Sequence, residues 1–244
     1  TWLYRREAQK VQDLELAAKE LFDVTYLISN QEVELFERIA GDSNGVEVLG
    51  NGLNTQEFYP APNRINTSSS APVFIFTGVM DYKPNVDAVV WFVKECWSGV
   101  LANWPNAKFI IAGMSPSSEV LALAEDSSIE VTGFVDDILP YYHQADYFVA
   151  PFRIARGVQN KVLQAFACGL PVISTSMGAE GIPCNDGEQI LLANTPAEFL
   201  QQIGVLQTDN GLAKALVSNA LELINEQFSW EGKLKPLAEE LERG

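Results

Sequence analysis

The feature that most constrains this chain is a repeated unit, in which a short apolar run ends at a small or turn residue and a helical stretch follows. Continuous runs rich in β-branched and aromatic residues are typical of strands buried on both faces of a parallel sheet. Their alternation with helices predicts a doubly wound parallel α/β sheet. The expected strands are Val73–Thr77, Lys108–Ala112, Ile129–Thr132, Tyr147–Ala150, Val172–Ser174 and Gln189–Ala193. A short helix is expected at Val135–His143, before the fourth of these strands.

The residues that end these runs predict one ligand crevice. Gly78, Gly113 and Gly133 follow the first three strands, and Pro151 follows the fourth. In an open parallel sheet, ligands bind outside the carboxyl ends of the strands. We therefore expect these four positions to border a single site.

The loop after Tyr147–Ala150 gives that site a charge preference. It carries basic and polar residues up to a predicted helix of about residues 158–168, and no Asp or Glu occurs from Tyr147 to Ala179. Free N–H groups, the positive end of the helix dipole and basic side chains attract anions. We expect this loop to bind the diphosphate of a nucleotide-sugar. The residues concerned are Arg153, Arg156, Gly157, Val158, Gln159, Asn160 and Lys161.

Individual roles follow from side-chain chemistry. Arg156 and Lys161 are the candidates for stabilising the diphosphate, because a guanidinium fork and a mobile ammonium both suit phosphate oxygens. Gln164 shares a helix face with Lys161 and could hydrogen-bond a ribose or sugar hydroxyl. Phe134 and Val135 could contact a nucleobase, and Lys83 could reach a phosphate. Each also has a structural interpretation, as a solvated surface charge, an exposed amide or a loop-packing residue.

Composition excludes several other classes of protein. A formal net charge of −16 argues against nucleic-acid binding, which needs a basic surface. The presence of a single histidine, His143, argues against a histidine-based metal site, and Asp136-Asp137 is not an Asp-x-Asp pattern, so we expect no metal. The segment after Val73–Thr77 lacks G-x-G-x-x-G, so a dinucleotide redox cofactor is not supported. We expect no cofactor and no transmembrane segment, because no apolar run approaches about 20 residues.

The remaining segments suggest how the chain is divided. Helical spacing covers residues 2–22, a short strand is expected at Val24–Ser29, a helix at Gln31–Ile39 and a strand at Val46–Leu49. Residues 51–63 have no periodicity and contain Pro60 and Pro62, which indicates a linker. After the sheet, helices are expected from Thr195 or Pro196 to about Leu206, over 211–228, and from Ser229 to about Glu242.

Several spaced segments resemble group-one glycosyltransferases of the GT-B fold. They are GNGLNTQEFYP, FTGVMDYKPN, VTGFVDDILPYYHQADYFVAPF and RGVQNKVLQAFACGLPVIST. Within that family, MDYKPNVDAVVWF and ARGVQNKVLQAFA look most like the exosortase-associated sugar transferases of exopolysaccharide synthesis. The family's usual loop has a Glu, seven residues and another Glu. Here those positions are Arg156 and Gln164.

The resemblance implies a division of labour between two Rossmann-like domains. Residues 1–50 would be the tail of the N-terminal acceptor domain, 51–70 the interdomain linker, 71–228 the nucleotide-sugar-binding domain and 229–244 a C-terminal crossover helix. The implied activity is metal-independent, retaining transfer of a hexosyl-type sugar to a glycan or lipid-linked acceptor. The acceptor would bind through the missing N-terminal domain, so this chain alone would be inactive.

Other functions stay open at this point. A GT-B-type nucleotide-sugar epimerase would bind the same donor, and a noncatalytic nucleotide-binding or scaffold module would keep the fold without the chemistry. A related domain with another anionic ligand is a further alternative. The expected setting is cytoplasmic, at most peripheral to the inner membrane.

Overall fold

The computed structural model describes residues 2–28, 30–50, 52–62, 69–155 and 157–243. The chain divides into two compact units, one formed by residues 1–52 with 230–244 and the other by residues 53–229. The first unit contains α1 (Trp2–Leu21), β1 (Thr25–Leu27), α2 (Asn30–Ala40), β2 (Val46–Val48) and α10 (Trp230–Arg243), with β1 and β2 paired in parallel.

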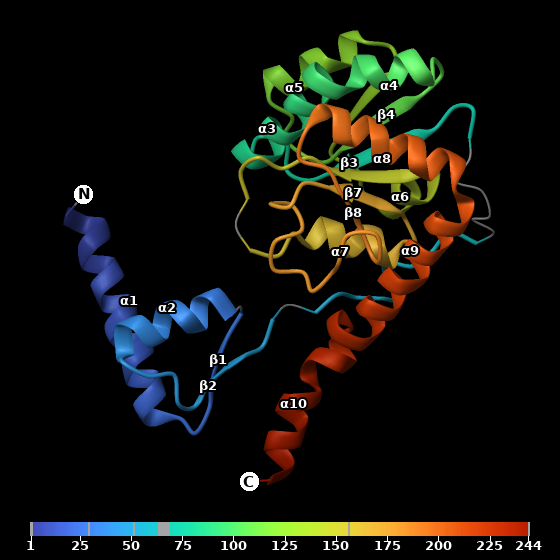
Figure 1. The fold of residues 1–244 in the computed structure, drawn as a ribbon. Coiled ribbons are helices and arrows are strands. Elements are labelled where there is room, and N and C mark those ends of the chain that lie inside the picture. The colour runs from blue at the N-terminus through green and yellow to red at the C-terminus, as the bar shows by residue number, and fades with distance from the viewer. Residues whose placement is uncertain (1, 29, 51, 63–68, 156, 244) are drawn as a thin grey trace. The chain divides into compact units, whose positions relative to one another are not determined.

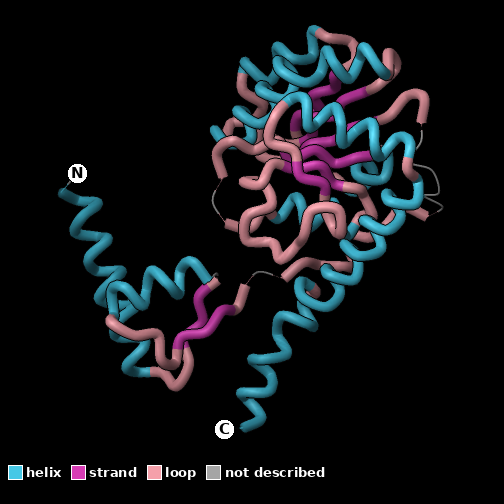
Figure 2. The backbone as a smooth tube through the Cα atoms, viewed as in Figure 1, coloured by secondary structure: helices cyan, strands magenta, loops and turns pink. Residues whose placement is uncertain are grey.

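The second unit is built on a six-stranded sheet in which every strand pairing is parallel. Helices lie on both sides of this sheet (Figures 1 and 2). The expected parallel α/β fold is therefore confirmed. The strands are β3 (Val73–Thr77), β4 (Lys108–Ala112), β5 (Ile129–Gly133), β6 (Tyr147–Ala150), β7 (Val172–Ser174) and β8 (Leu191–Leu192).

Helical segments connect these strands. They are α3 (Lys83–Phe92), the π-helical turn η1 (Val93–Trp97), α4 (Ser98–Asn103), α5 (Ser118–Ala122), the 3₁₀ turn η2 (Leu123–Glu125), α6 (Leu139–Gln144), α7 (Asn160–Ala167), α8 (Pro196–Thr208), α9 (Asn210–Leu223) and the π-helical turn η3 (Ile224–Phe228). The helix expected over 211–228 thus ends in a π-helical turn.

Strand order places the ligand crevice. The order across the sheet is β5-β4-β3-β6-β7-β8. The chain moves outward from β3 through β4 to β5 and then returns to place β6 on the other side of β3. In such sheets the loops after the two central strands part, which opens a crevice at their carboxyl ends. The loops after β3 and β6 therefore flank the expected site.

Aromatic packing holds the two helical layers on the sheet. On one face, Phe199 of α8 packs edge-on against Phe92 of α3, with ring centroids 5.6 Å apart. On the other, the ring of Tyr142 in α6 is stacked against Phe148 of β6, with centroids 6.0 Å apart. Tyr142 and Phe148 are fully buried. Burial of such rings contributes much of the apolar stabilisation that fixes α6 beside the crevice.

Several boundaries differ from the sequence-based expectation, and two of these differences bear on the cleft and the core. The helix expected from Val135 begins at Leu139, because the carboxylate of Asp137 accepts the backbone N–H of Leu139 at 2.9 Å and ends the preceding loop. The segment expected as the interdomain linker, residues 51–70, contains Leu53 and Phe58, which are buried in the core of the second unit. Among the described residues, no helix is both long and apolar enough to cross a bilayer.

Candidate functional site

A cleft of about 860 Å³ lies at the carboxyl end of the sheet, where the strand order predicts it. Segments that follow β3, β4 and β5 form its walls together with the first turns of α3 and α7. Its lining residues are Thr77, Gly78, Val79, Asp81, Tyr82, Asn85, Ala112, Gly113, Met114, Phe134, Val135, Ile138, Asn160, Lys161 and Gln164.

Two glycines let the loops after β3 and β4 approach each other closely. Gly113 has φ +144, and a Cβ built on it would lie 1.8 Å from the carbonyl oxygen of Gly78. At Gly78, φ is +153 and a Cβ would lie 2.8 Å from Nζ of Lys161 and 2.7 Å from Nδ2 of Asn85. Side chains at these positions would collide with backbone or with the polar groups of the cleft, so both sites require glycine.

Lys161 is the basic group at the centre of the cleft. Its Nζ donates a hydrogen bond to Oδ1 of Asn85, whose own Nδ2 donates to the carbonyl oxygen of Val79 at 2.9 Å. Asn85 is 4% exposed, so its amide is fixed by these two contacts. The Lys161 ammonium also lies 4.8 Å from the ring centroid of Phe76 and 5.1 Å from that of Phe152. Lys161 therefore has a neutral amide and two aromatic faces as its neighbours.

This environment changes the pKa of Lys161. Burial disfavours the charged ammonium and lowers the pKa of Lys161 from its ordinary value of 10.5 to about 7. An anion that entered the cleft would favour the charged form and restore a higher pKa. The site is thus arranged to gain electrostatic stabilisation when a negative group binds.

Gln164 lies one helical turn after Lys161 and is tied to the core. Its Oε1 accepts a hydrogen bond from the hydroxyl of Tyr142 at 3.1 Å. The Tyr142 hydroxyl in turn lies 2.7 Å from Oγ1 of Thr77. Burial raises the pKa of Tyr142 far above its usual value, so its hydroxyl stays protonated.

An apolar wall completes the cleft. Phe134 is 67% exposed at its edge, and Val135, Ile138 and Met114 also line it. Exposed apolar side chains gathered around a cavity are typical of a ligand-binding surface.

The structure brings some of the expected residues together and not others. Gly78, Phe134, Val135, Asn160, Lys161 and Gln164 line the cleft, whereas Gly133, Gly157, Val158 and Gln159 stand outside the lining set. Lys83 and Arg153 line a different groove of about 320 Å³ beside α3. Arg156 lies outside the described residues.

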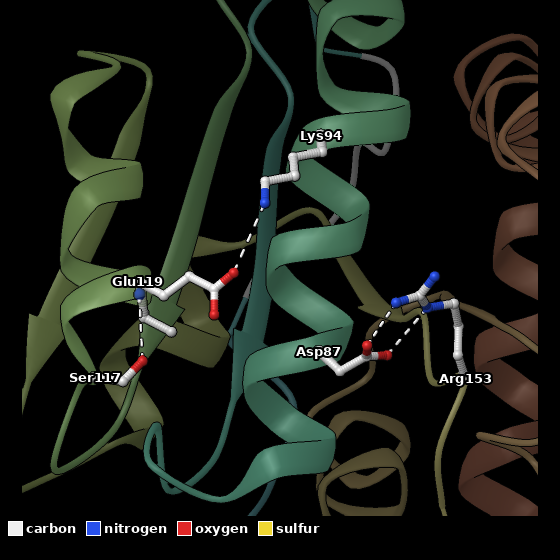
Figure 3. Close-up of polar contacts among 6 residues, drawn as sticks. Asp87, Lys94, Ser117, Glu119 and Arg153 are labelled. Atoms are coloured by element: carbon white, nitrogen blue, oxygen red, sulfur yellow. Dashed lines mark hydrogen bonds and ion pairs between the residues drawn. The ribbon is translucent and has the colours of Figure 1, made fainter.

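Arg153 makes contacts that sequence alone did not predict. Its guanidinium donates two hydrogen bonds to Asp87 of α3, from Nε at 3.0 Å and from Nη2 at 2.5 Å, and lies 5.8 Å from the ring centroid of Trp91. Figure 3 shows Arg153 and Asp87 facing each other, with a second ion pair between Lys94 and Glu119. The loop after β6 lacks acidic residues in sequence, but α3 supplies one in space.

Three polar residues of the site were not predicted from the sequence. Asn85 occurs within the quoted DYKPN segment, directly after the proline that opens α3, and Tyr142 precedes His143, which drew attention instead. His143 has a structural contact, because its Nε2 lies 2.8 Å from the carbonyl oxygen of Tyr59. Thr77 could have been predicted, because it is the last residue of an expected strand and strand ends border the crevice. No spacing pattern in the sequence marks Asn85 or Tyr142 as residues of the site.

The described residues also show how the metal-ligating and thiol side chains are placed. No group of three or more His, Cys, Asp or Glu side chains is arranged to hold a metal ion there. Cys96 and Cys168 are buried free thiols, and Cys184 is a half-buried free thiol.

Comparisons with known proteins agree with this architecture. The profile of the family described as "Glycosyl transferases group 1" matches residues 71–209, more than half of the chain. A D-inositol 3-phosphate glycosyltransferase of Streptomyces bingchenggensis is 30% identical over 235 residues, which covers 84% of this chain and 50% of the relative. An "uncharacterized 44.6 kDa protein in cps region" of Klebsiella pneumoniae is 25% identical over 162 residues, which covers 63% of this chain and 42% of the relative.

A solved structure shows the same fold. The crystal structure of Anabaena Alr3699/HepE in complex with UDP and glucose matches with a TM-score of 0.69 at 16% identity and covers 96% of this chain and 67% of that one. The present chain spans half or less of the length of the two curated relatives. On the profile match over residues 71–209, this chain belongs to the group 1 glycosyl transferase family.

Proposed function

We propose that the cleft binds the diphosphate of a nucleotide-sugar and that the whole protein transfers the sugar to an acceptor. The observation that carries this proposal is Lys161, a partly buried lysine whose pKa is lowered to about 7 at the carboxyl end of the sheet. Few ligands other than a multiply charged anion would repay the desolvation of such a group. The Anabaena structure of the same fold contains UDP, which supports uridine diphosphate as the first nucleotide to test.

The proposed chemistry follows from how charge moves. The bond from the anomeric carbon to the β-phosphate oxygen breaks, and that carbon forms a bond to the acceptor hydroxyl oxygen, whose proton passes to an oxygen of the departing diphosphate. Negative charge then develops on the departing nucleoside diphosphate. Lys161 and the backbone N–H groups at the start of α7 would stabilise that charge, with Arg156 as a further candidate. We propose a retaining, metal-independent transfer of a hexosyl-type sugar.

The proposal extends to the biological setting of the whole protein. The Klebsiella relative is described as a protein in the cps region, which supports polysaccharide synthesis and a glycan or lipid-linked acceptor. The exosortase-associated subgroup is proposed on the sequence motifs alone. Because residues 1–50 resemble only the tail of an acceptor domain, this chain would bind nucleotide without transferring sugar.

Calorimetry tests the diphosphate site directly. Uridine and guanosine diphosphates are titrated into the wild-type chain, Lys161→Met, and Lys94→Met as a matched control on the surface of the same unit. We expect Lys161→Met to weaken binding of the preferred nucleotide at least about tenfold, because it removes a charged partner of the phosphates. Lys94→Met should bind as the wild type does. Equal affinities in the two variants would contradict the proposed diphosphate site. Substantial sugar transfer by this chain would contradict its proposed inactivity.

A further inference from the structure

Three polar side chains run in a line from the core to the cleft. Thr77 ends β3, Tyr142 lies in α6 and Gln164 lies in α7, with oxygen–oxygen distances of 2.7 Å and 3.1 Å between successive members. Tyr142 is 0% exposed and Thr77 is 4% exposed. Hydrogen bonds at such depth are costly to leave unmade, because water cannot replace a lost partner.

The direction of these hydrogen bonds follows from the hydrogens available. Each hydroxyl carries one hydrogen, and Tyr142 is the hydrogen-bond partner of the Thr77 hydroxyl among the residues that the structure describes. If Tyr142 donated to Thr77, the buried Thr77 hydrogen would be left without an acceptor. Thr77 therefore donates to Tyr142, and Tyr142 donates to Gln164. Of the two ends of the Gln164 amide, only the carbonyl oxygen Oε1 can accept a hydrogen bond, so Oε1 is the end that faces Tyr142.

This direction decides which end of the Gln164 amide meets a ligand. With Oε1 held by Tyr142, the amino group Nε2 is the end left to the cleft, where it has no protein acceptor among the described residues. The position therefore offers two N–H donors. A glutamate at the same place would offer acceptors only and would add a negative charge one turn from Lys161.

We propose that Tyr142 is a positioning residue that fixes the Gln164 amide with its amino group toward the cleft, so that this position selects a ligand carrying an oxygen acceptor. The inference rests on the proposed nucleotide-sugar site. Gln164 is hydrogen-bonded to Tyr142 of α6, and the apolar wall with Phe134 and Ile138 directly precedes α6 in the chain. Gln164 also lies one helical turn after Lys161 on α7. A group between a base on that wall and a diphosphate on Lys161 is a ribose, whose hydroxyl oxygens can accept the two N–H groups.

The test compares nucleotides that differ by one hydroxyl. UDP, 2′-deoxy-UDP and 3′-deoxy-UDP are titrated calorimetrically into the full chain as wild type, Tyr142→Phe, Gln164→Leu and the double variant. Tyr141→Phe, the neighbouring tyrosine on α6, is the matched control. We expect the wild type and the control to prefer UDP over one deoxy analogue by about tenfold, the loss expected for one hydrogen bond to an acceptor.

The variants separate positioning from general stability. Gln164→Leu should abolish the preference, and Tyr142→Phe should reduce it to about threefold or less, because a freed amide can turn. In the double variant, Tyr142→Phe should change nothing further. An undiminished preference in Tyr142→Phe, or no preference in the wild type that binds UDP, would overturn the inference.

A measurement without nucleotide keeps the inference apart from the proposed function. In the free wild-type chain, NMR should show fast exchange of the Gln164 side-chain amide protons with water, since they face the cleft. Slow exchange would mean that Nε2 faces Tyr142 and would overturn the orientation. If UDP fails to bind the wild type, the nucleotide site is contradicted, while this measurement still decides how the amide is oriented.

Discussion

At the residue scale, the buried charge of Lys161 destabilises the nucleotide-free protein and would stabilise a bound anion. Its lowered pKa of about 7 means that the folded state disfavours the proton that the unfolded chain holds up to about pH 10.5. Lys161→Met should therefore stabilise the nucleotide-free chain, on the order of 2 kcal/mol after loss of the Asn85 contact, or roughly 5 °C in Tm. Thermal unfolding measures this, and a lower Tm than that of wild type would contradict it.

The same pKa makes binding depend on pH in a defined direction. Below about pH 7 the free cleft already carries the Lys161 charge, and a bound diphosphate raises the pKa in the complex. Affinity should be constant below pH 7 and fall above it, by up to about tenfold for each pH unit until the pKa of the complex is reached. UDP-glucose is the suitable ligand, because its diphosphate does not titrate in this window. Titrations at pH 6 to 9 check it, and Lys161→Met should give a flat profile.

Linkage also gives a sign for the stability of the nucleotide-free protein. Between about pH 7 and 10.5 the unfolded state binds more protons at Lys161 than the folded state does, so this residue makes the free energy of unfolding rise with pH there. Below about pH 7, Lys161 is charged in both states and its destabilising contribution to the free energy of unfolding is at its maximum. In Lys161→Met this contribution to the pH dependence should be missing.

Residues also show what sequence could and could not predict about the site. Lys161 and Gln164 were predictable, because their loop and helix follow a strand that ends in the crevice. Arg153 was expected in the same place, yet its partner Asp87 comes from α3, 66 positions earlier in the chain. Local acid content describes neighbours in sequence, whereas ion pairs depend on neighbours in space.

At the element scale, the close approach of the loops after β3 and β4 leads to a prediction about backbone. Gly113→Ala would place a Cβ 1.8 Å from the Gly78 carbonyl oxygen, at φ +144, so the loops would have to separate. We expect a loss of at least about 3 kcal/mol in the free energy of unfolding. Gly204→Ala in the interior of α8 is the control, because its Cβ meets nothing within 4 Å, and it should stabilise by about 0.5–1 kcal/mol. Denaturant unfolding distinguishes the two; equal effects would contradict the argument.

Elements differ in how well sequence predicts their ends. β4, β6 and β7 have the expected bounds, because unbroken apolar runs between turn residues leave little choice. α6 starts four residues later than expected, at Leu139, whose backbone N–H donates to the Asp137 carboxylate. Phe134, Val135 and Ile138 line the cleft instead of a helix face. Helical spacing depends only on which residues are apolar. Since apolar residues can line a cleft as well as a helix face, the spacing alone does not fix where the helix begins.

At the scale of the whole molecule, the two units differ in how much core they contain. Among the described residues, the buried apolar side chains of the first unit are Phe36 and Val46, whereas those of the second form a continuous cluster across both faces of its sheet. Helix α1 buries none of its 20 residues. A unit with so little buried apolar surface gains little free energy against the entropy of ordering its chain.

We therefore expect the first unit to open long before the second unfolds. Limited proteolysis of the full chain should cut within residues 2–52 and 230–243 first and leave a resistant fragment close to residues 53–229. Nucleotide should slow cleavage of that fragment without slowing the first cuts, because every residue of the cleft belongs to the second unit. Mass spectrometry of the fragments identifies the order. Early cuts inside the sheet, or nucleotide protection of α1, would show that the two units are not independent in stability.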